Sequence, residues 1–379
     1  MKKSTKKKTL GKFALIASII ILSFIFGVSI GGYLDEITSS GSLLPYLLML
    51  AVFIASVYLQ TIIHEAGHLV FGLMSGYKFS SFRIFSFMWV KDENSGKLKL
   101  KRFSLAGTGG QCLMAPPDTA DGSYPVILYN LGGPIMNVAV SVVCVILSAV
   151  FSSVYLLPSA LLTFSVMGFI FAIMNGIPMQ TDMITNDGYN ALSLTRDPYS
   201  RQAFWIQLKI NELVSQGTRL KDMPNEWFTV PSDRDMKNNH VATIGVYACN
   251  RLMDEQKFDE ADSLISHLLS TPGLCISGIY RGLLTCDRIY LECIRSGRKS
   301  VADTMLTKEQ KKFMQAMKAY PSVIRVEYAY ALLCERNTDK AAGLLSDFEA
   351  VAKRYPYESD VESERELIAI ANERSRTVL

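Results

Sequence analysis

The sequence predicts an all-α polytopic membrane protein with about four transmembrane helices, a small β-hairpin at the membrane surface and a soluble, helical-repeat-like domain after them. Of its 379 residues 49% are hydrophobic, which is a high fraction for a soluble protein of this length. Nearly all the long apolar runs lie before Pro178, whereas the chain from Tyr189 onward mixes charged and apolar residues as soluble helices do.

Four apolar stretches are long enough to cross the hydrocarbon core of a bilayer, which is about 30 Å thick. The first is expected to be an uncleaved anchor, because it is longer than the apolar part of a signal peptide and no A-x-A cleavage site follows it. The second exceeds one crossing, and ionisable side chains at membrane depth in its second half indicate a functional site. The expected spans are residues 13–32, 43–75, 125–151 and 156–178.

The distribution of basic residues predicts the orientation in the membrane. Six lysines lie among the first twelve residues, whereas Asp35 and Glu36 follow the first apolar stretch with no basic residue beside them. This pattern places both termini and the loop 77–124 in the cytoplasm. The basic residues of that loop are Lys78, Arg83, Lys91, Lys97, Lys99, Lys101 and Arg102.

We therefore expect a multi-pass protein of the cell membrane with three parts. These are a basic cytoplasmic N-terminus (1–12), a membrane domain (13–188) and a cytoplasmic helical domain (189–379). A bacterial source fits the size and the lysine-rich start. The lysines can also contact anionic lipids of the bilayer.

Overall charge and cysteine usage exclude several classes of protein. A net charge of +4 gives no reason to expect a nucleic-acid partner. The seven cysteines are odd in number, are scattered and include no C-x-x-C spacing, so they indicate neither a disulfide framework nor a cysteine zinc site. Reduced thiols are expected instead.

A metal-binding motif lies in the second apolar stretch. His64-Glu65-Ala66-Gly67-His68 matches H-E-x-x-H, in which histidines at i and i+4 share one helix face and can hold one zinc ion. Glu65 is then placed to accept a proton from a water at the metal. The motif could arise by chance on a helix, but two histidines and a glutamate inside an apolar span cost several kcal/mol unless they are used.

Catalytic zinc needs a third protein ligand. The chain has only four histidines, and His240 and His267 lie in the soluble half, where we read them as ordinary residues. The acidic residues after the fourth apolar stretch are Asp182 and Asp187. Asp187 is preferred, because Gly188 and a segment that can restart a helix would hold its carboxylate in a tight turn; Asp182 stays open as the alternative.

These motifs resemble the site-2 protease family of intramembrane metalloproteases. The family combines H-E-x-x-H on one span with an Asn-x-x-Pro segment leading to Asp-Gly on a later one, matched here by Asn175 to Pro178 and by Asp187-Gly188. Gly133-Pro134-Ile135-Met136-Asn137 resembles its Gly-Pro-x-x-Asn motif. The resemblance covers about residues 57–189, and the spacing from Asn175 to Asp187 is longer than is usual in the family.

The resemblance implies a zinc-dependent endopeptidase that cleaves membrane-embedded proteins or peptides with zinc-activated water. It implies Asn137 as a contact to the substrate backbone or the oxyanion; a helix–helix hydrogen bond is the alternative role. Alternation in 79–90 and 97–105 around Asn94-Ser95-Gly96 predicts the hairpin, whose edge could pair with an extended substrate or which could simply lie on the bilayer.

The soluble half resembles degenerate tetratricopeptide repeats. Ala248, Ala261 and Pro272 are spaced much as are Ala329, Ala341 and Pro356, and small residues there let paired helices pack closely. Such an array would offer a concave surface to a protein partner, and a plain helical bundle is the alternative. Two other functions remain open for the whole chain: a membrane zinc peptidase that matures soluble or exported peptides, and a non-catalytic scaffold that acts through the repeats.

Overall fold

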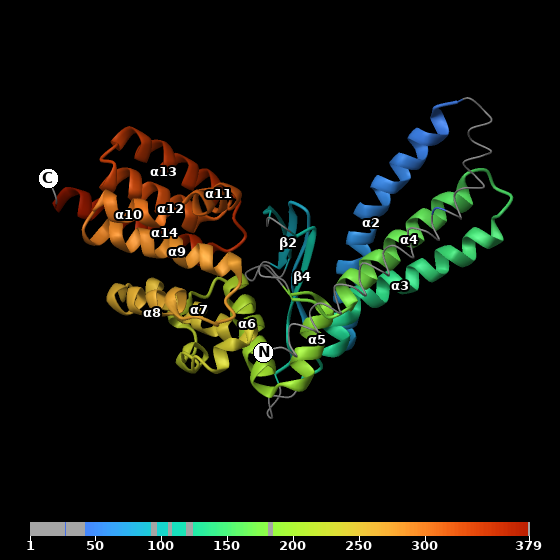
Figure 1. Cartoon of the computed structure of the whole chain (residues 1–379), viewed down its shortest axis with the longest axis horizontal. Coiled ribbons are helices and arrows are strands. Elements are labelled where there is room, and N and C mark those ends of the chain that lie inside the picture. The colour runs from blue at the N-terminus through green and yellow to red at the C-terminus, as the bar shows by residue number, and fades with distance from the viewer. Residues whose placement is uncertain are drawn as a thin grey trace. The chain divides into compact units, whose positions relative to one another are not determined.

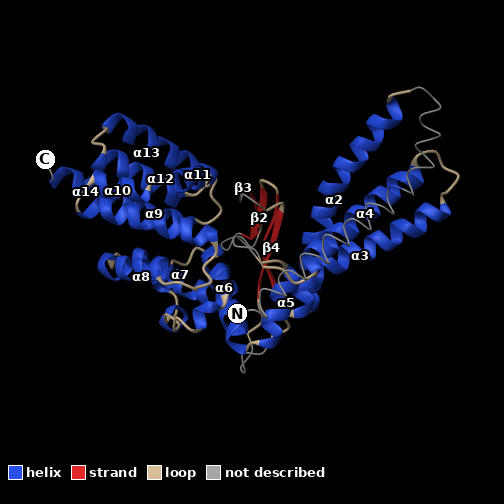
Figure 2. Ribbon diagram, in the orientation of Figure 1, coloured by secondary structure: helices blue, strands red, loops and turns tan. Residues whose placement is uncertain are grey.

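The computed structural model describes residues 27, 42–91, 97–104, 108–118, 124–180 and 185–377. Most of these residues are helical, and the described strands form one small sheet (Figures 1 and 2). The chain divides into two compact units. The membrane unit contains residues 1–78, 109–112 and 117–197, and the helical unit contains residues 79–108, 113–116 and 198–379.

Three long helices in the membrane unit are long and apolar enough to cross a bilayer: α2 (Leu44–Met74), α3 (Ile127–Val150) and α4 (Leu157–Gly176). They pack against one another (Figure 1) and lie within two residues of the second, third and fourth apolar stretches of the sequence. The first stretch, 13–32, lies outside the described residues apart from Gly27. With 31 residues, α2 is about 46 Å long, so it extends beyond the apolar core of a bilayer.

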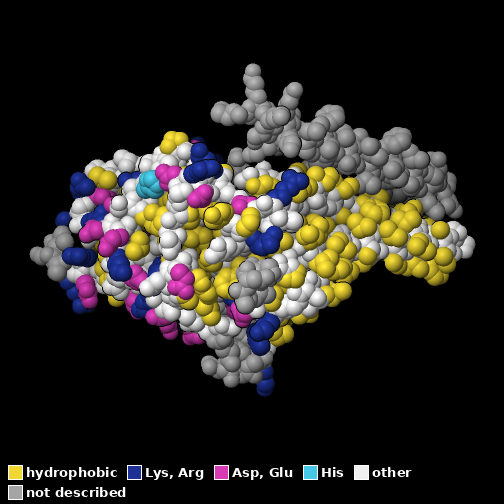
Figure 3. All heavy atoms as spheres, turned by 90° about the horizontal axis from the view of Figure 1, so that it is seen from below, with side chains coloured by type: hydrophobic (Ala, Val, Ile, Leu, Met, Phe, Trp, Pro, Cys, Tyr) yellow, Lys and Arg dark blue, Asp and Glu magenta, His cyan; other side chains and the backbone are white. Residues whose placement is uncertain are grey.

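The three helices are apolar on their surface and polar inside. Phe53, Ile54 and Ile146 are exposed, and hydrophobic side chains cover most of the visible surface of these helices (Figure 3). Lipid offers no alternative hydrogen-bond partner, so polar groups in such helices turn inward and bond to one another. The buried polar side chains are those of Ser56, Gln60, Thr61, His64, Glu65, His68, Asn130, Asn137, Ser141, Ser148, Ser159, Thr163 and Ser165.

Glycine allows α2 and α3 to cross closely. An ideal Cβ at Gly67 would lie 2.3 Å from the carbonyl oxygen of Gly132, and one at Gly132 would lie 2.6 Å from that of Gly67. Neither position therefore accepts a side chain without moving a backbone. The crossing lies at the H-E-x-x-H turn of α2 and brings α3 against the two histidines.

The sheet contains β1 (Lys78–Ile84), β2 (Phe87–Lys91), β3 (Leu98–Arg102) and β4 (Gly110–Ala115) in the order β3-β2-β1-β4. β2 and β3 pair antiparallel, with Phe87 opposite Arg102 and Lys91 opposite Leu98, so a hairpin does surround the predicted turn. The segment before that turn is not one strand as the alternation suggested. It is divided into β1 and β2 at Phe85, whose φ of 53° makes a tight reversal.

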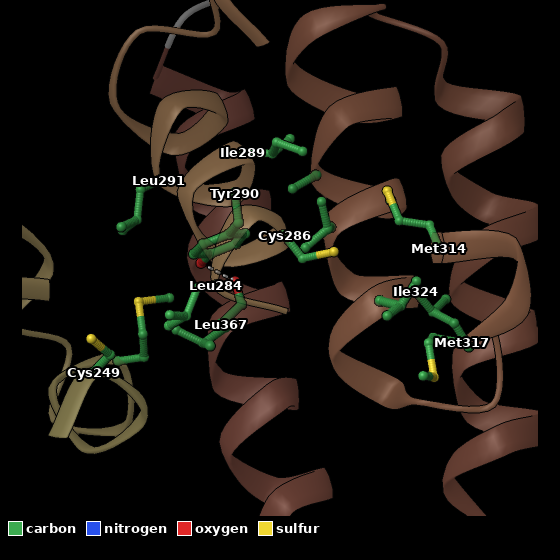
Figure 4. Close-up of a cluster of buried hydrophobic side chains, with 14 of the residues drawn as sticks. Cys249, Leu284, Cys286, Ile289, Tyr290, Leu291, Met314, Met317, Ile324 and Leu367 are labelled. Atoms are coloured by element: carbon green, nitrogen blue, oxygen red, sulfur yellow. Dashed lines mark hydrogen bonds between the residues drawn. The ribbon is translucent and has the colours of Figure 1, made fainter. Parts of the chain in front are cut away.

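Most of the sheet, in residues 79–108 and 113–116, belongs to the helical unit, and the start of β4, in residues 109–112, belongs to the membrane unit. Met88, Val90 and Phe103 belong to the hydrophobic core of the helical unit, where Phe103 contacts the rings of Tyr320 and Tyr355. Tyr290 on α9 (Gly278–Arg295) lies in that core and donates a hydrogen bond of 2.7 Å to the carbonyl oxygen of Leu367 on α14 (Glu358–Thr377) (Figure 4). The α-helices of this unit are α6 (Pro198–Ser215), α7 (Asn239–Asp254), α8 (Phe258–Ser270), α9 (Gly278–Arg295), α10 (Lys299–Met305), α11 (Lys308–Ala316), α12 (Pro321–Ala329), α13 (Thr338–Ala352) and α14 (Glu358–Thr377).

The alanines that suggested repeats lie in two packed helix pairs. Ala248 and Ala261 are buried in α7 and α8, and Ala329 and Ala341 are buried in α12 and α13. Short connections include three 3₁₀ turns, and α12 runs into a π-helical turn at Tyr330–Cys334. The packing agrees with close helix pairs, and the tetratricopeptide assignment stays a prediction.

Candidate metal centre

His64 and His68 stand one turn apart on the buried face of α2. Their exposed fractions are 7% and 8%, and their Nε2 atoms are 3.2 Å apart. The i, i+4 spacing puts both rings on one side of the helix, as the motif predicts. His240 and His267 lie in the helical unit, on α7 and α8, and take no part in this cluster.

Asp187 joins the histidines from the first residue of α5 (Asp187–Arg196). Its Oδ2 lies 3.1 Å from Nε2 of His64 and 3.4 Å from Nε2 of His68. In the part of the chain that the structure describes, these three residues form the one group of His, Cys, Asp or Glu that could hold a metal ion. Asp182 lies outside the described residues.

Asn186 fixes the turn that presents Asp187. Its Oδ1 accepts hydrogen bonds from the backbone nitrogens of Met179 (2.8 Å) and Tyr189 (3.0 Å), which caps the start of α5. Its Nδ2 donates to the carbonyl oxygens at the end of α4, including that of Ile177 at 2.6 Å. Asn186 is not among the site residues predicted from the sequence, although an asparagine just before Asp-Gly and a new helix is a recognisable cap signal.

Glycine at position 188 lets α5 start this close to α4. An ideal Cβ there would lie 2.1 Å from the carbonyl oxygen of Gly176. The turn is therefore held by a capping side chain on one side and by backbone contact on the other. Together they hold the Asp187 carboxylate close to both histidine rings.

The hydrogen bonds of the two rings leave both Nε2 atoms bare. Nδ1 of His68 lies 2.7 Å from the carbonyl oxygen of Tyr129, and Nδ1 of His64 lies 2.8 Å from Oδ1 of Asn137. Both partners are acceptors, so each neutral imidazole carries its proton on Nδ1. The Nε2 lone pairs then face each other and Oδ2 of Asp187, which has no hydrogen bond of acceptable geometry.

Three facing lone pairs repel one another unless a cation or a proton lies between them. A tetrahedral zinc ion with bonds of 2.0–2.1 Å would place its ligand atoms about 3.3 Å apart. The three separations here are 3.1, 3.2 and 3.4 Å. Two imidazoles, one carboxylate and a free fourth position are also a common donor set for catalytic zinc, so the residues fit that ion.

Glycines leave room for the side chains of Glu65 and His64. An ideal Cβ at Gly110, the first residue of β4, would lie 2.6 Å from Oε1 of Glu65. An ideal Cβ at Gly133 would lie 2.5 Å from Cε1 of His64. Glu65 is 8% exposed, so its carboxylate is held beside the histidines with little contact to solvent.

Asn137 is completely buried, and the structure places its amide against protein groups. Oδ1 faces the ring of His64, and Nδ2 donates to Gln60 at 2.8 and 3.1 Å. Gln60 is also absent from the site residues predicted from the sequence, although a glutamine in the middle of an apolar span is a visible signal.

Comparison with known proteins supplies the family context. The model of peptidase family M50 matches residues 52–344, which include the H-E-x-x-H motif, Asp187 and most of the helical unit. No curated protein and no solved structure matched this chain.

Proposed function

Because this chain belongs to peptidase family M50, the metalloproteases of the site-2 protease type, we propose that it cleaves peptide bonds of membrane-embedded proteins or peptides. The observation that carries the proposal is the convergence of three bare ligand atoms, from His64, His68 and Asp187, on one point of the membrane unit. His64 and His68 lie on α2, and Asp187 follows α4, so the site belongs to the spanning helices themselves.

His64, His68 and Asp187 would hold the zinc ion through Nε2, Nε2 and Oδ2. Zinc held there would supply a Lewis acid that makes a water more acidic and polarises the scissile carbonyl. Glu65 takes the proton of the attacking water on its carboxylate and returns it to the nitrogen of the leaving chain. Burial keeps this proton within the site, and Gly110 leaves space for the carboxylate.

The start of β4 supports a way of holding the substrate. A helical substrate has its carbonyls bonded internally and must unwind before attack. β4 lies at one edge of the sheet, and its first residue, Gly110, packs against Glu65. An extended substrate paired with this edge by strand addition would bring its backbone to the catalytic carboxylate.

We extend the proposal to the domains and the topology. A membrane domain of residues 13–188 would be followed by a cytoplasmic domain of residues 189–379, with both termini in the cytoplasm of a bacterial cell. Seven basic residues between α2 and α3 support this orientation. A protein partner would bind the helical unit on the concave surface that a repeat array offers. It would then recruit substrate or gate the site.

The proposal is tested by trapping substrate on Glu65→Gln. The variant keeps the three ligands and lacks the proton acceptor, so it should retain zinc and accumulate uncut substrate. Membranes of cells that express wild type, Glu65→Gln or the exposed control Glu358→Gln are compared by mass spectrometry of protein N-termini and of co-purified proteins. We expect new N-termini within or beside transmembrane segments in wild type and the control alone, with the parent proteins bound to Glu65→Gln.

Other outcomes of the same experiment select the other functions. Short soluble or exported peptides trapped on Glu65→Gln would replace the proposal with peptide maturation. Identical N-termini in wild type and Glu65→Gln would remove the catalytic role and leave a scaffold that acts through the helical unit.

A further inference from the structure

Gln60 uses both ends of its buried amide to connect the three spanning helices. It lies on α2, one turn before His64, and is 0% exposed. Its Nε2 donates a hydrogen bond of 2.9 Å to the carbonyl oxygen of Phe164 on α4. Its Oε1 accepts a hydrogen bond of 2.8 Å from Nδ2 of Asn137 on α3.

Asn137 links Gln60 to the metal centre through hydrogen bonds to both Gln60 and His64. Besides Oε1 of Gln60, its Nδ2 also reaches the backbone oxygen of Gln60 at 3.1 Å. Its Oδ1 is left to accept from Nδ1 of His64 at 2.8 Å. Both amide hydrogens are thus committed to Gln60, so the oxygen is the atom that faces the imidazole.

The bond to Phe164 decides which group donates and which accepts in each of these hydrogen bonds. The carbonyl oxygen of Phe164 can only accept, so Gln60 must present its NH₂ group to α4 and its oxygen to Asn137. Asn137 must then present its NH₂ group to Gln60 and its oxygen to His64. The proton of the neutral imidazole is therefore placed on Nδ1, and Nε2 is left bare toward Asp187 and His68.

We infer that Gln60 is a positioning residue of the metal centre: through Asn137 it holds the ring and the tautomer of His64 in the ligating state. The inference rests on the proposed function, because it concerns the same zinc ligands. Asn137 is then a partner of a ligand in this structure, and its two donor hydrogens are not free for a substrate.

A comparison of the Nδ1 acceptors of His68 and His64 shows why the His64 ring depends on Asn137 and Gln60. Nδ1 of His68 bonds directly to the carbonyl oxygen of Tyr129, a backbone acceptor on α3 that substitution of a side chain does not remove. His64 lies instead against Gly133, and its acceptor is a side-chain oxygen that must itself be oriented. Substitutions in the spans should therefore disturb the His64 side of the site more than the His68 side.

The test compares Gln60→Leu with a matched control on the same helix. Thr61 is also buried, and its hydroxyl donates to the carbonyl oxygen of Val57 on the same helix. Thr61→Val therefore removes a buried hydrogen bond and leaves those of Gln60, Asn137 and His64 in place. Zinc affinity of the full-length, detergent-solubilised protein is measured by competition with a chelator. We expect Gln60→Leu to bind zinc about 10–100-fold more weakly than wild type, as second-shell changes do, and Thr61→Val to stay within about threefold.

A double-mutant cycle separates positioning from general packing. Asn137→Leu should lower zinc affinity as much as Gln60→Leu does. The double variant should lose little more affinity than either single variant, because each of the three variants breaks the same hydrogen-bonded path to His64. Absorption spectra of the cobalt-substituted proteins add a direct view, since loss of the His64 ligand changes the tetrahedral spectrum of Gln60→Leu but not of Thr61→Val. If Gln60→Leu is not monodisperse, the unbranched Gln60→Met takes its place.

The inference fails if Gln60→Leu and Thr61→Val bind zinc equally well, or if the two losses in the cycle simply add. Both results require zinc in wild type, so they leave the proposed function standing. Absence of zinc from metal-replete wild type would instead refute the proposed function itself.

Discussion

The metal centre of the membrane unit and a charged cluster in the helical unit both bury ionisable side chains, yet they balance charge differently. In the helical unit each arginine of the cluster meets two carboxylates: Arg325, 1% exposed, contacts Asp287 at 2.5 Å and Glu364 at 2.6 Å. Arg219 similarly pairs with Asp254 and Glu366. Charges of opposite sign pair with one another there, largely out of contact with solvent, and such pairing is how proteins usually hold ionised groups in their interior.

The metal centre has no such internal balance among the described residues. Its hydrogens are directed outward, to Tyr129 and Asn137, and its lone pairs are directed inward to one point. The charged cluster places arginine side chains between its carboxylates. In the metal centre the space between the three ligand atoms is left to an ion or an extra proton. The difference separates a binding site from a stabilising network, even though both are buried.

The largest expected effect is a loss of zinc binding when a single methyl group is added at Gly133. Gly133→Ala would place Cβ 2.5 Å from Cε1 of the His64 ring, so the ring must move out of the ligating position. We expect this variant to lose essentially all bound zinc, measured by metal analysis of purified protein. Gly343→Ala is the control, because no atom lies within 4 Å of an ideal Cβ there.

The matching substitution beside the Glu65 carboxylate should leave zinc binding intact. Gly110→Ala would put Cβ 2.6 Å from Oε1 of Glu65, which displaces the proposed proton acceptor but none of the proposed metal ligands. We expect near-normal zinc and a loss of cleavage of about 10²–10⁴-fold, the usual contribution of a general base. If both glycine variants lost zinc equally, displacing Glu65 would disturb zinc binding as much as displacing His64, which would contradict this prediction.

Breaking the charged cluster should affect stability and not zinc. Arg325→Ala leaves Asp287 and Glu364 buried without their cation, which costs about 3–5 kcal/mol. Arg288, whose side chain is 43% exposed and lies 3.8 Å from Asp262, is the control, since surface pairs contribute about 0–1 kcal/mol. Thermal unfolding of the helical unit within the full chain measures the difference, and reduced zinc binding by Arg325→Ala would contradict the independence of the two clusters.

The smallest effect is a dependence of stability on pH from two carboxyls of α14, Glu364 of this cluster and Asp360. Burial and the nearby Asp254 raise the pKa of Asp360 to about 7, and burial raises the pKa of Glu364 to about 7 despite Arg325. Unfolded carboxyls titrate near 4, so the folded protein holds more protons between pH 4 and 7. This contribution to stability is present below about pH 4 and is lost as the pH rises through 7.

Asp360→Asn isolates that dependence. Because the amide in this variant cannot ionise, its Tm relative to that of wild type should rise by a few degrees between pH 5 and pH 8. Glu362→Gln, an exposed carboxylate on the same helix, should show no such relative rise. A constant difference between Asp360→Asn and wild type across this range would contradict the raised pKa.

The two regions also differ in how far the sequence predicts them. Long apolar runs predict α2, α3 and α4 closely, because a lipid-exposed helix must be apolar along its length. The sheet was harder: the reversal at Phe85 has no glycine or proline to signal it, and β4 (GQCLMA) has no clear alternation. Its packing with the helical unit depends on contacts distant in sequence, such as Phe103 with Tyr355.

Within the site, local motifs predict the ligands and leave the supporting residues hidden. His64, Glu65 and His68 follow from five consecutive residues, and Asp187 was preferred from its turn. Gln60, Asn186 and Gly110 act through partners far along the chain, and one sequence does not reveal which polar residues of separate spans will meet.

The most direct test of the metal centre is the zinc content of purified, detergent-solubilised protein. Wild type is compared with His68→Ala, Asp187→Ala and Asp182→Ala after growth with sufficient zinc. We expect about one zinc per chain in wild type and Asp182→Ala, and a large loss in His68→Ala and Asp187→Ala. Wild-type protein without zinc would mean that a proton holds the three ligand atoms together, and zinc that persists in Asp187→Ala but falls in Asp182→Ala would assign the third ligand to Asp182.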